Sequence, residues 1–314
     1  GLFQSLADVV KFLGKEDFVP GHVEKFYFLL APVLVLLPAF MTFAVVPFGG
    51  DITVNGRLIH IQMADLNVGI LYILSIGSLG VYGIIMAGWS SNNKYSLLGS
   101  LRSSAQMVSY ELALGLSVVA MIMLYGTVNM REMVMAQDAT IFGILPRWGI
   151  FLQPVGFLIF LTAVFAETNR LPFDLPEGES EIVAGYHTEY GAMKFALFFM
   201  AEYMNMVTAS AMLATMFFGG FLMLPGMAHL VEPLSHLFLK FGDIANPADW
   251  ARILLEVMSF GAKVAFFMWF FVWVRWTLPR FRYDQLMDIG WKVLLPLSLA
   301  NIAVTAVLIY LRVL

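Results

Sequence analysis

Between residues 166 and 191 the sequence sets six carboxylates against a single arginine, Arg170. The six are Glu167, Asp174, Glu177, Glu179, Glu181 and Glu189. Pro172 and Pro176 stiffen the segment, and apolar residues such as Phe173 are interleaved with the acids. Carboxylates that lie close together and partly out of water raise one another's pKa, which is what a proton relay requires. The alternative is an acidic loop that simply faces water.

Two further carboxylates lie inside long apolar stretches. Glu111 follows Arg102 by nine residues and Glu202 follows Lys194 by eight, so each lies about 12–14 Å further along a helix. Ionisable side chains inside a membrane span are costly and mark functional sites by default. The alternative is a structural pair, for example with Lys263, which in turn has Glu256 within reach.

A basic and aromatic run spans residues 275–284, RWTLPRFRYD. Its ionisable and aromatic members include Arg275, Arg280, Arg282, Tyr283 and Asp284. Such a run is typical of an interfacial anchor on the positively charged side of a membrane. The alternative is a docking surface for an acidic partner.

The elements that must position these residues are membrane spans. Of the 314 residues, 60% are hydrophobic and 13% charged, and the mean hydropathy is +0.81, which excludes a water-soluble globule. Seven stretches have the length and composition to cross a bilayer. They lie near 26–47, 68–88, 106–126, 150–166, 195–224, 257–274 and 293–311. We predict an all-α polytopic helix bundle with amphipathic interfacial helices, forming one membrane domain over residues 1–314.

The distribution of basic residues predicts the orientation. The connections on the side of the N-terminal segment, side A, hold eleven Lys and Arg, whereas those on side B hold six. Side A should therefore face the cytoplasm or its organellar equivalent. Residues 1–25 read as an amphipathic segment lying on side A, residues 166–194 as the acidic loop on the same side, and residues 225–256 as a connection on side B.

Several classes of chemistry have no support. The formal net charge is −4, which argues against nucleic-acid binding. The sequence has no cysteine, so thiolate-bound iron–sulfur clusters and disulfides are excluded. The five histidines lie in polar loops or connections, which argues against a haem within the spans. We expect no metal and no cofactor bound by this chain.

Three long motifs carry a resemblance to a known family. They are GWSSNNKYSLLGSLRSSAQMVSYE (88–111), AETNRLPFDLPEGESEIVAGYHTEYGAMKFALFFMAEY (166–203) and RWTLPRFRYDQLMDIGWK (275–292). With the opening GLFQSLADVVKFLGKED, they resemble the quinone-site membrane subunit of respiratory complex I, which is called H in bacteria and subunit 1 in mitochondria. The resemblance covers essentially the whole chain.

The resemblance implies an eight-span subunit without cofactor, of which this sequence starts just after the first span. It implies a quinone chamber shared with two peripheral subunits, one carrying the terminal iron–sulfur cluster, and FMN and further clusters in partner subunits. Small and antiporter-like membrane subunits are the other expected partners. Carried over, the proton-coupling carboxylates are Glu111, Glu167, Glu177, Glu179, Glu181, Glu189 and Glu202. The chamber residues are Asp8, Lys11, Arg170, Phe173 and Asp174.

The function expected from this resemblance is the quinone-binding and proton-coupling membrane subunit of a proton-pumping NADH:quinone oxidoreductase. We expect it in a bacterial plasma membrane, with an organellar inner membrane as the alternative. One rival is the homologous membrane subunit of an energy-converting [NiFe] hydrogenase. The other is an ion-coupled secondary transporter using Glu111, Glu202 and Lys263, although no duplicated halves are visible.

Overall fold

The computed structural model describes residues 3–54, 57–141, 145–174, 182–235 and 247–311. In this part of the chain six helical segments are long and apolar enough to cross a membrane, which confirms the all-α membrane bundle. They are α2 (Lys25–Phe43), α3 (Gly69–Ser90), α4 (Lys94–Tyr125), α9 (Ala192–Phe217), α11 (Pro247–Thr277) and the run from α12 (Tyr283–Asp288) through a π-helical turn (Ile289–Leu294) to α13 (Leu295–Tyr310).

The fourth expected span, near 150–166, is two helices instead of one. Helix α6 (Gly149–Leu152) ends at Gln153, whose φ of −133° and ψ of 59° are not helical, and α7 (Pro154–Glu167) starts with a proline. Proline fits the first helical position because the missing N–H would have had no partner there. The 14 residues of α7 extend about 21 Å, short of the roughly 30 Å of a bilayer core.

The remaining elements are short. Helix α1 (Gln4–Gly14) precedes the bundle, and α5 (Met130–Ala136) and the 3₁₀ turns η1 (Gly185–His187) and η2 (Met227–Leu230) lie in connections. Two antiparallel hairpins pair β1 (Asp51–Val54) with β2 (Arg57–His60) and β3 (Thr140–Ile141) with β4 (Leu145–Pro146). Of the candidate residues, Glu111, Glu167 and Glu202 lie on helices, whereas Arg170, Asp174 and Glu189 lie in connections.

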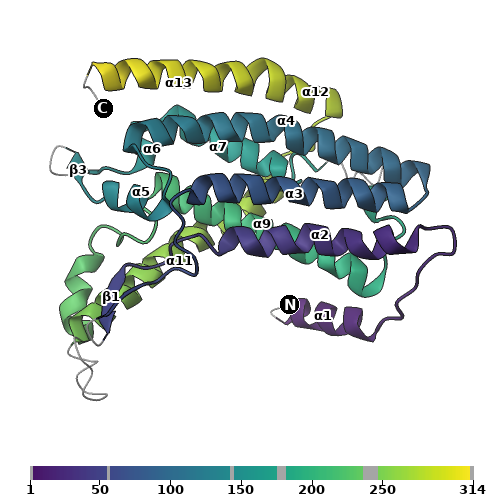
Figure 1. Cartoon of the computed structure of the whole chain (residues 1–314), viewed down its shortest axis with the longest axis horizontal. Helices are drawn as coiled ribbons and strands as arrows, with labels where there is room; N and C mark the ends of the chain where they lie inside the picture. Colours follow the sequence, from purple (N-terminus) through teal and green to yellow (C-terminus); the bar gives the residue numbers. More distant parts are fainter. Residues whose placement is uncertain (1–2, 55–56, 142–144, 175–181, 236–246, 312–314) are drawn as a thin grey trace.

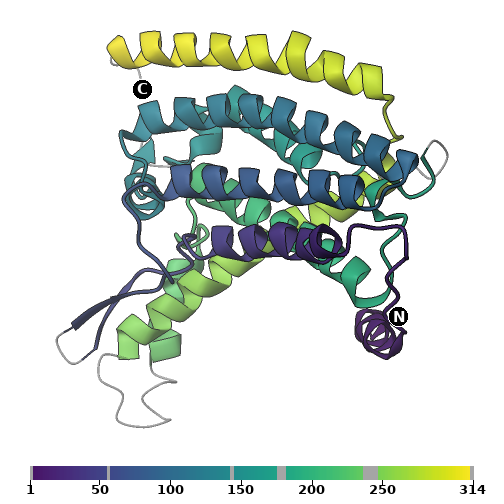
Figure 2. The same ribbon diagram turned by 45° about the vertical axis from the view of Figure 1, so that its right-hand side comes forward.

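The connections gather at the two ends of the bundle as the predicted topology requires. In Figure 1 the ends of α2, α3, α4 and α12 that adjoin side-A connections lie on the right, while α5, β1 and β3 lie on the left. Helix α1 packs on the start of α9, with the Phe12 and Phe195 rings 6.1 Å apart. Figure 2 views α1 almost end-on while α3 and α4 run across the picture, so α1 is not one of the parallel helices of the bundle.

A close approach fixes α2 against α3. A Cβ built on Gly83 would lie 2.5 Å from Val35 Cγ2 and 2.9 Å from the Val35 backbone nitrogen, so only glycine fits there. The neighbouring Gly80 has no atom within 4 Å of such a Cβ. Small residues that let helix backbones approach are a common packing device in membranes.

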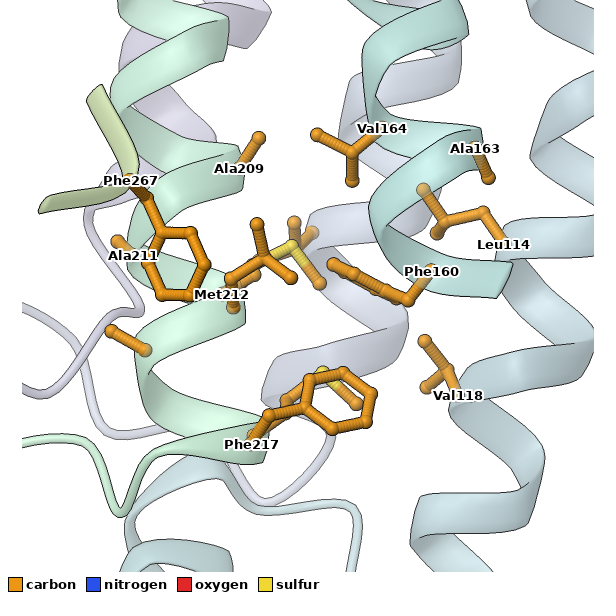
Figure 3. Packing of buried hydrophobic residues seen from close by; sticks show 14 of the residues in the cluster. Leu114, Val118, Phe160, Ala163, Val164, Ala209, Ala211, Met212, Phe217 and Phe267 are labelled. Carbon is orange, nitrogen blue, oxygen red and sulfur yellow. The ribbon is translucent and has the colours of Figure 1, made fainter. Parts of the chain in front are cut away.

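The main hydrophobic core lies between α4, α7 and α9. Figure 3 shows Phe160 of α7 between Leu114 and Val118 of α4 and Met212 and Phe217 of α9. The Phe160 and Phe217 rings are 5.6 Å apart, and both side chains are fully buried. Because lipid tails are as apolar as these residues, close van der Waals packing is what favours the helix contacts over contacts with lipid.

Candidate functional site

Glu111 lies on α4 at the groove between α3 and α4. Its Oε1 accepts a hydrogen bond from the Ser78 hydroxyl of α3. Glu111 also lines a shallow, mostly apolar groove with Leu74, Leu112 and Gly115. The carboxylate is thus held by a neighbouring helix and stays partly accessible from the groove.

Glu167 ends α7 and borders a small cavity, here called the upper cavity, of about 50 Å³. Leu74 lines both this cavity and the groove beside Glu111, so one side chain separates the two spaces. Gly77 lies one residue before Ser78, and a Cβ on Gly77 would meet Glu167 Oε1 at 3.9 Å. The polar residues around the upper cavity, besides Glu167, are Thr42, Thr168, Asn205 and Thr208.

Glu202 of α9 lines a second space, the lower cavity, of about 20 Å³. The lower cavity shares Glu167, Met107, Thr168 and Asn205 with the upper one, so the two adjoin. Glu111, Glu167 and Glu202, which come from three different helices, therefore border three neighbouring spaces, namely the groove, the upper cavity and the lower cavity.

Arg170 neutralises Glu202, the carboxylate that borders the lower cavity. Its Nε lies 2.9 Å from Glu202 Oε1, and the two side chains are only 12% and 13% exposed. The guanidinium also lies over the Tyr203 ring, 4.6 Å from its centre. A buried carboxylate without such a partner would carry a large desolvation cost.

Glu189 lies apart from both cavities. Its Oε1 accepts a hydrogen bond of 2.8 Å from the Asn93 side chain at the start of α4, and its Oε2 is 3.6 Å from His22 Nε2. Burial raises the pKa of the adjacent Tyr190 phenol, so it stays protonated and donates to the Phe28 carbonyl oxygen at 3.1 Å. Glu189 thus joins the connections on side A.

Only part of the acidic loop is covered by the structure. Glu177, Glu179 and Glu181 lie outside the described residues. Before them, Phe173 is buried between Tyr110 and Phe281, with ring-centre distances of 5.8 Å and 5.6 Å. Phe173 therefore anchors the start of the loop to the core.

The 275–284 run meets this loop. Arg280 is 3.3 Å from Asp174 Oδ2, and the Phe281 N–H donates to the Pro172 carbonyl oxygen at 3.1 Å. Arg282 pairs with Asp284 at 3.2 Å, the Arg102 guanidinium lies over the Tyr283 ring, and Arg275 is exposed. Part of the run thus contacts the loop of its own chain, and Arg275, Arg282 and Asp284 remain on the surface.

Asp8 and Lys11 lie on α1, away from the buried carboxylates. Lys11 is exposed beside Phe12, and Asp8 accepts a 3.4 Å hydrogen bond from Gln4. The α1 segment is tied to the bundle by Lys194, which pairs with Asp17 just after α1.

The alternative in which Lys263 pairs with an acid is not found among the residues that the structure describes. Lys263 Nζ donates to the carbonyl oxygens of Gly220 and Leu222 at 2.9 Å and 2.7 Å. Glu256 instead accepts from Arg252 and from the Gly50 backbone N–H, both at 2.8 Å. The carbonyls of the non-helical turn after α9 have no helical partner, and the long lysine side chain donates to both, while the Ser259 hydroxyl also donates to the Leu222 carbonyl at 2.9 Å.

Sequence reasoning missed the neutral residues of the site. Ser78, Asn205 and Thr208 lie within apolar spans and carry no charge, so they did not stand out beside the acids. The available signal was spacing. Asn205 and Thr208 follow Glu202 by three and six residues, and Ser78 lies next to Gly77, which leaves room for a carboxylate.

Comparison with known proteins gives a consistent result. Residues 1–306 match the family described as NADH dehydrogenase. The H subunit of the NADH-quinone oxidoreductase of Bdellovibrio bacteriovorus is 48% identical, over 99% of this chain and 85% of that protein. The H subunit from Protochlamydia amoebophila is 47% identical over 98% of this chain and 83% of its own. The H subunit from Flavobacterium psychrophilum is 46% identical over 98% of this chain and 84% of its own length.

Proposed function

The chain belongs to the NADH dehydrogenase family, and on that premise we propose that it forms one wall of the quinone chamber of a NADH-quinone oxidoreductase and links quinone reduction to proton translocation. It is a membrane protein and a subunit of this multi-subunit oxidoreductase. The names of its relatives favour this function over the hydrogenase subunit and the secondary transporter.

One observation supports the coupling role most. Three carboxylates on three helices, Glu111, Glu167 and Glu202, border adjoining spaces inside an otherwise apolar bundle. A stability role alone would favour apolar residues, because buried charges are expensive in a membrane. A chain of carboxylates with room for water is what proton transfer requires.

The proposed mechanism starts where the loop meets the bundle. Quinone takes up two electrons from a partner subunit and two protons, which gives quinol. The negative charge that appears on the quinone before protonation acts on the acidic loop and on Arg170. We expect Asp8, Lys11, Phe173 and Asp174 at the chamber. Glu167, Glu177, Glu179, Glu181, Glu189, Glu202 and Glu111 are the groups expected to relay protons onward.

The partners follow from the proposed enzyme. They are the peripheral quinone-site subunits, including one that carries the terminal iron–sulfur cluster, and the small and antiporter-like membrane subunits. The FMN and the iron–sulfur clusters belong to those partners. The exposed residues Arg275, Arg282 and Asp284 suit a contact with a peripheral subunit on side A. The membrane is a bacterial plasma membrane, as the bacterial relatives suggest.

The test replaces buried carboxylates in the intact enzyme. Glu167→Gln and Glu202→Gln keep the size of the side chain and remove its negative charge, so we expect loss of proton translocation in sealed vesicles. The control is Glu132→Gln, an exposed acid of α5 on the opposite side of the membrane, bonded to Thr127. Native proton translocation per quinone reduced in both buried variants would overturn the proposal.

A further inference from the structure

The three threonines of the upper cavity use their hydroxyl groups differently. The Thr42 hydroxyl donates to the Ala39 carbonyl oxygen at 2.9 Å, and the Thr168 hydroxyl donates to the Val164 carbonyl oxygen at 2.9 Å. The Thr208 hydroxyl, by contrast, has no hydrogen-bond partner among the residues that the structure describes. Thr208 is only 6% exposed.

A small polar ligand bound in the cavity would satisfy the Thr208 hydroxyl. A buried hydroxyl without a hydrogen bond destabilises the folded protein. A threonine hydroxyl in a helix commonly donates to the carbonyl four residues back, as that of Thr168 does. The Thr208 hydroxyl makes no such bond in the described structure. The cavity it borders has about 50 Å³, and roughly 10–15 Å³ is enough for one water.

The surroundings supply the other partners that a buried water needs. Buried waters make about three hydrogen bonds to polar groups. The Glu167 carboxylate and the Asn205 side chain border the same cavity as Thr208. Asn205 and Glu167 also border the lower cavity, where Glu202 lies, so polar groups continue from one carboxylate to the next.

We propose that Thr208 is a positioning residue that holds an ordered water cluster between Glu202 and Glu167, through which protons pass. This inference rests on the proposed function and adds the hydroxyl group that holds the water by a hydrogen bond. In each transfer a protonated Glu202 gives its proton to the nearest water, and another water gives a proton to the Glu167 carboxylate. One proton leaves one acid and one arrives at the other, and the water is regenerated.

Gly77 supports the same arrangement from the opposite wall. A Cβ at this position would lie in ordinary contact with Glu167 Oε1, at 3.9 Å, with no other atom within 4 Å. The absent side chain therefore leaves space directly beside the carboxylate. Gly77→Ala should fill this space with a methyl group without a clash.

The experiment compares two threonine-to-valine variants of the intact enzyme in sealed vesicles. Thr208→Val removes the unpaired hydroxyl at nearly constant shape. The matched control is Thr215→Val on the same helix, which removes a buried hydroxyl that already bonds the Ala211 carbonyl oxygen at 2.7 Å and lines neither cavity. We expect Thr208→Val to slow coupled quinone reduction roughly tenfold, the effect of about 1.4 kcal/mol in the barrier. We also expect a larger solvent deuterium isotope effect on turnover, which a purely structural defect would not cause.

Rescue and a second variant complete the test. Thr208→Ser restores the hydroxyl and should return the rate and the isotope effect to native values, and Gly77→Ala should resemble Thr208→Val. Native rates and isotope effects in both Thr208→Val and Gly77→Ala would overturn the proposal that Thr208 holds a water cluster. If Glu167→Gln still abolishes translocation in that case, the carboxylate route stands and only this inference fails. If Thr208→Val fails to assemble, Gly77→Ala alone decides by the same criterion.

Discussion

The buried ion pair between Arg170 and Glu202 predicts a non-additive pattern in a double-mutant cycle. We consider Arg170→Gln, Glu202→Gln and the double variant, each in the assembled enzyme. Each single change removes one member of the ion pair and leaves the opposite charge buried. The double change leaves two neutral amides of similar size that are able to bond each other.

The structure sets the size of the effect. At the observed 2.9 Å and an effective dielectric constant of about 20, the attraction between the charges is about 6 kcal/mol, and desolvation offsets much of it. Removing one partner of a buried pair costs about 3–5 kcal/mol, whereas replacing both costs far less. Arg170→Gln also loses the contact with the Tyr203 ring, worth about 0.5–2 kcal/mol, so it should be the less stable of the two single variants.

The assay separates stability from proton transfer. Heat inactivation of membranes that hold the enzyme should show midpoints several degrees below native for both single variants and partial recovery in the double variant. Proton translocation should stay low in the double variant, because it still lacks the Glu202 carboxylate. A double variant less stable than either single variant would refute the reasoning about the pair. Full translocation by the double variant would remove Glu202 from the route.

Two further changes test the packing of the bundle. Gly83→Ala should lower the yield of folded subunit, because its methyl group would collide with Val35. The control Gly80→Ala, where nothing lies within 4 Å of the added Cβ, should fold normally. The amount of subunit in membrane extracts measures both yields, and equal yields would contradict the close approach of α2 to α3. Lys263→Met should destabilise the subunit by about 1–3 kcal/mol, because it leaves the buried Gly220 carbonyl without its donor, whereas the Leu222 carbonyl keeps the Ser259 hydroxyl. The ratio of protons to electrons should stay native in the enzyme that assembles. A changed ratio would give Lys263 a part in proton transfer.

The sequence allowed the spans and the buried acids to be predicted, because each rests on local composition. Glu111 and Glu202 interrupt long apolar stretches, and their depth follows from the helical rise. The break at Gln153 was not predicted, since the apolar run continues through it and the proline that follows is compatible with a helix start.

The contacts between helices could not be predicted from the sequence. That Glu202 pairs with Arg170, and not with Lys263, depends on how α7 and α9 pack, which no spacing along one helix determines. The hydrogen bonds of Lys263 could not be predicted, because only the folded chain brings the carbonyls of the turn after α9 to this side chain. Thr208 was overlooked because its significance lies in a missing partner, which is a property of the packed site.

The break between α6 and α7 has a consequence for how the chain is made. The Gln153 amide donates to Thr305 at 2.7 Å and its oxygen accepts from Asn301 at 3.1 Å, and both partners lie on α13. Translation reaches α13 after the other helices described here, so Gln153 is synthesised 148 residues before Asn301 and 152 residues before Thr305. A nascent chain truncated before α13 therefore lacks both of these hydrogen-bond partners of the Gln153 side chain.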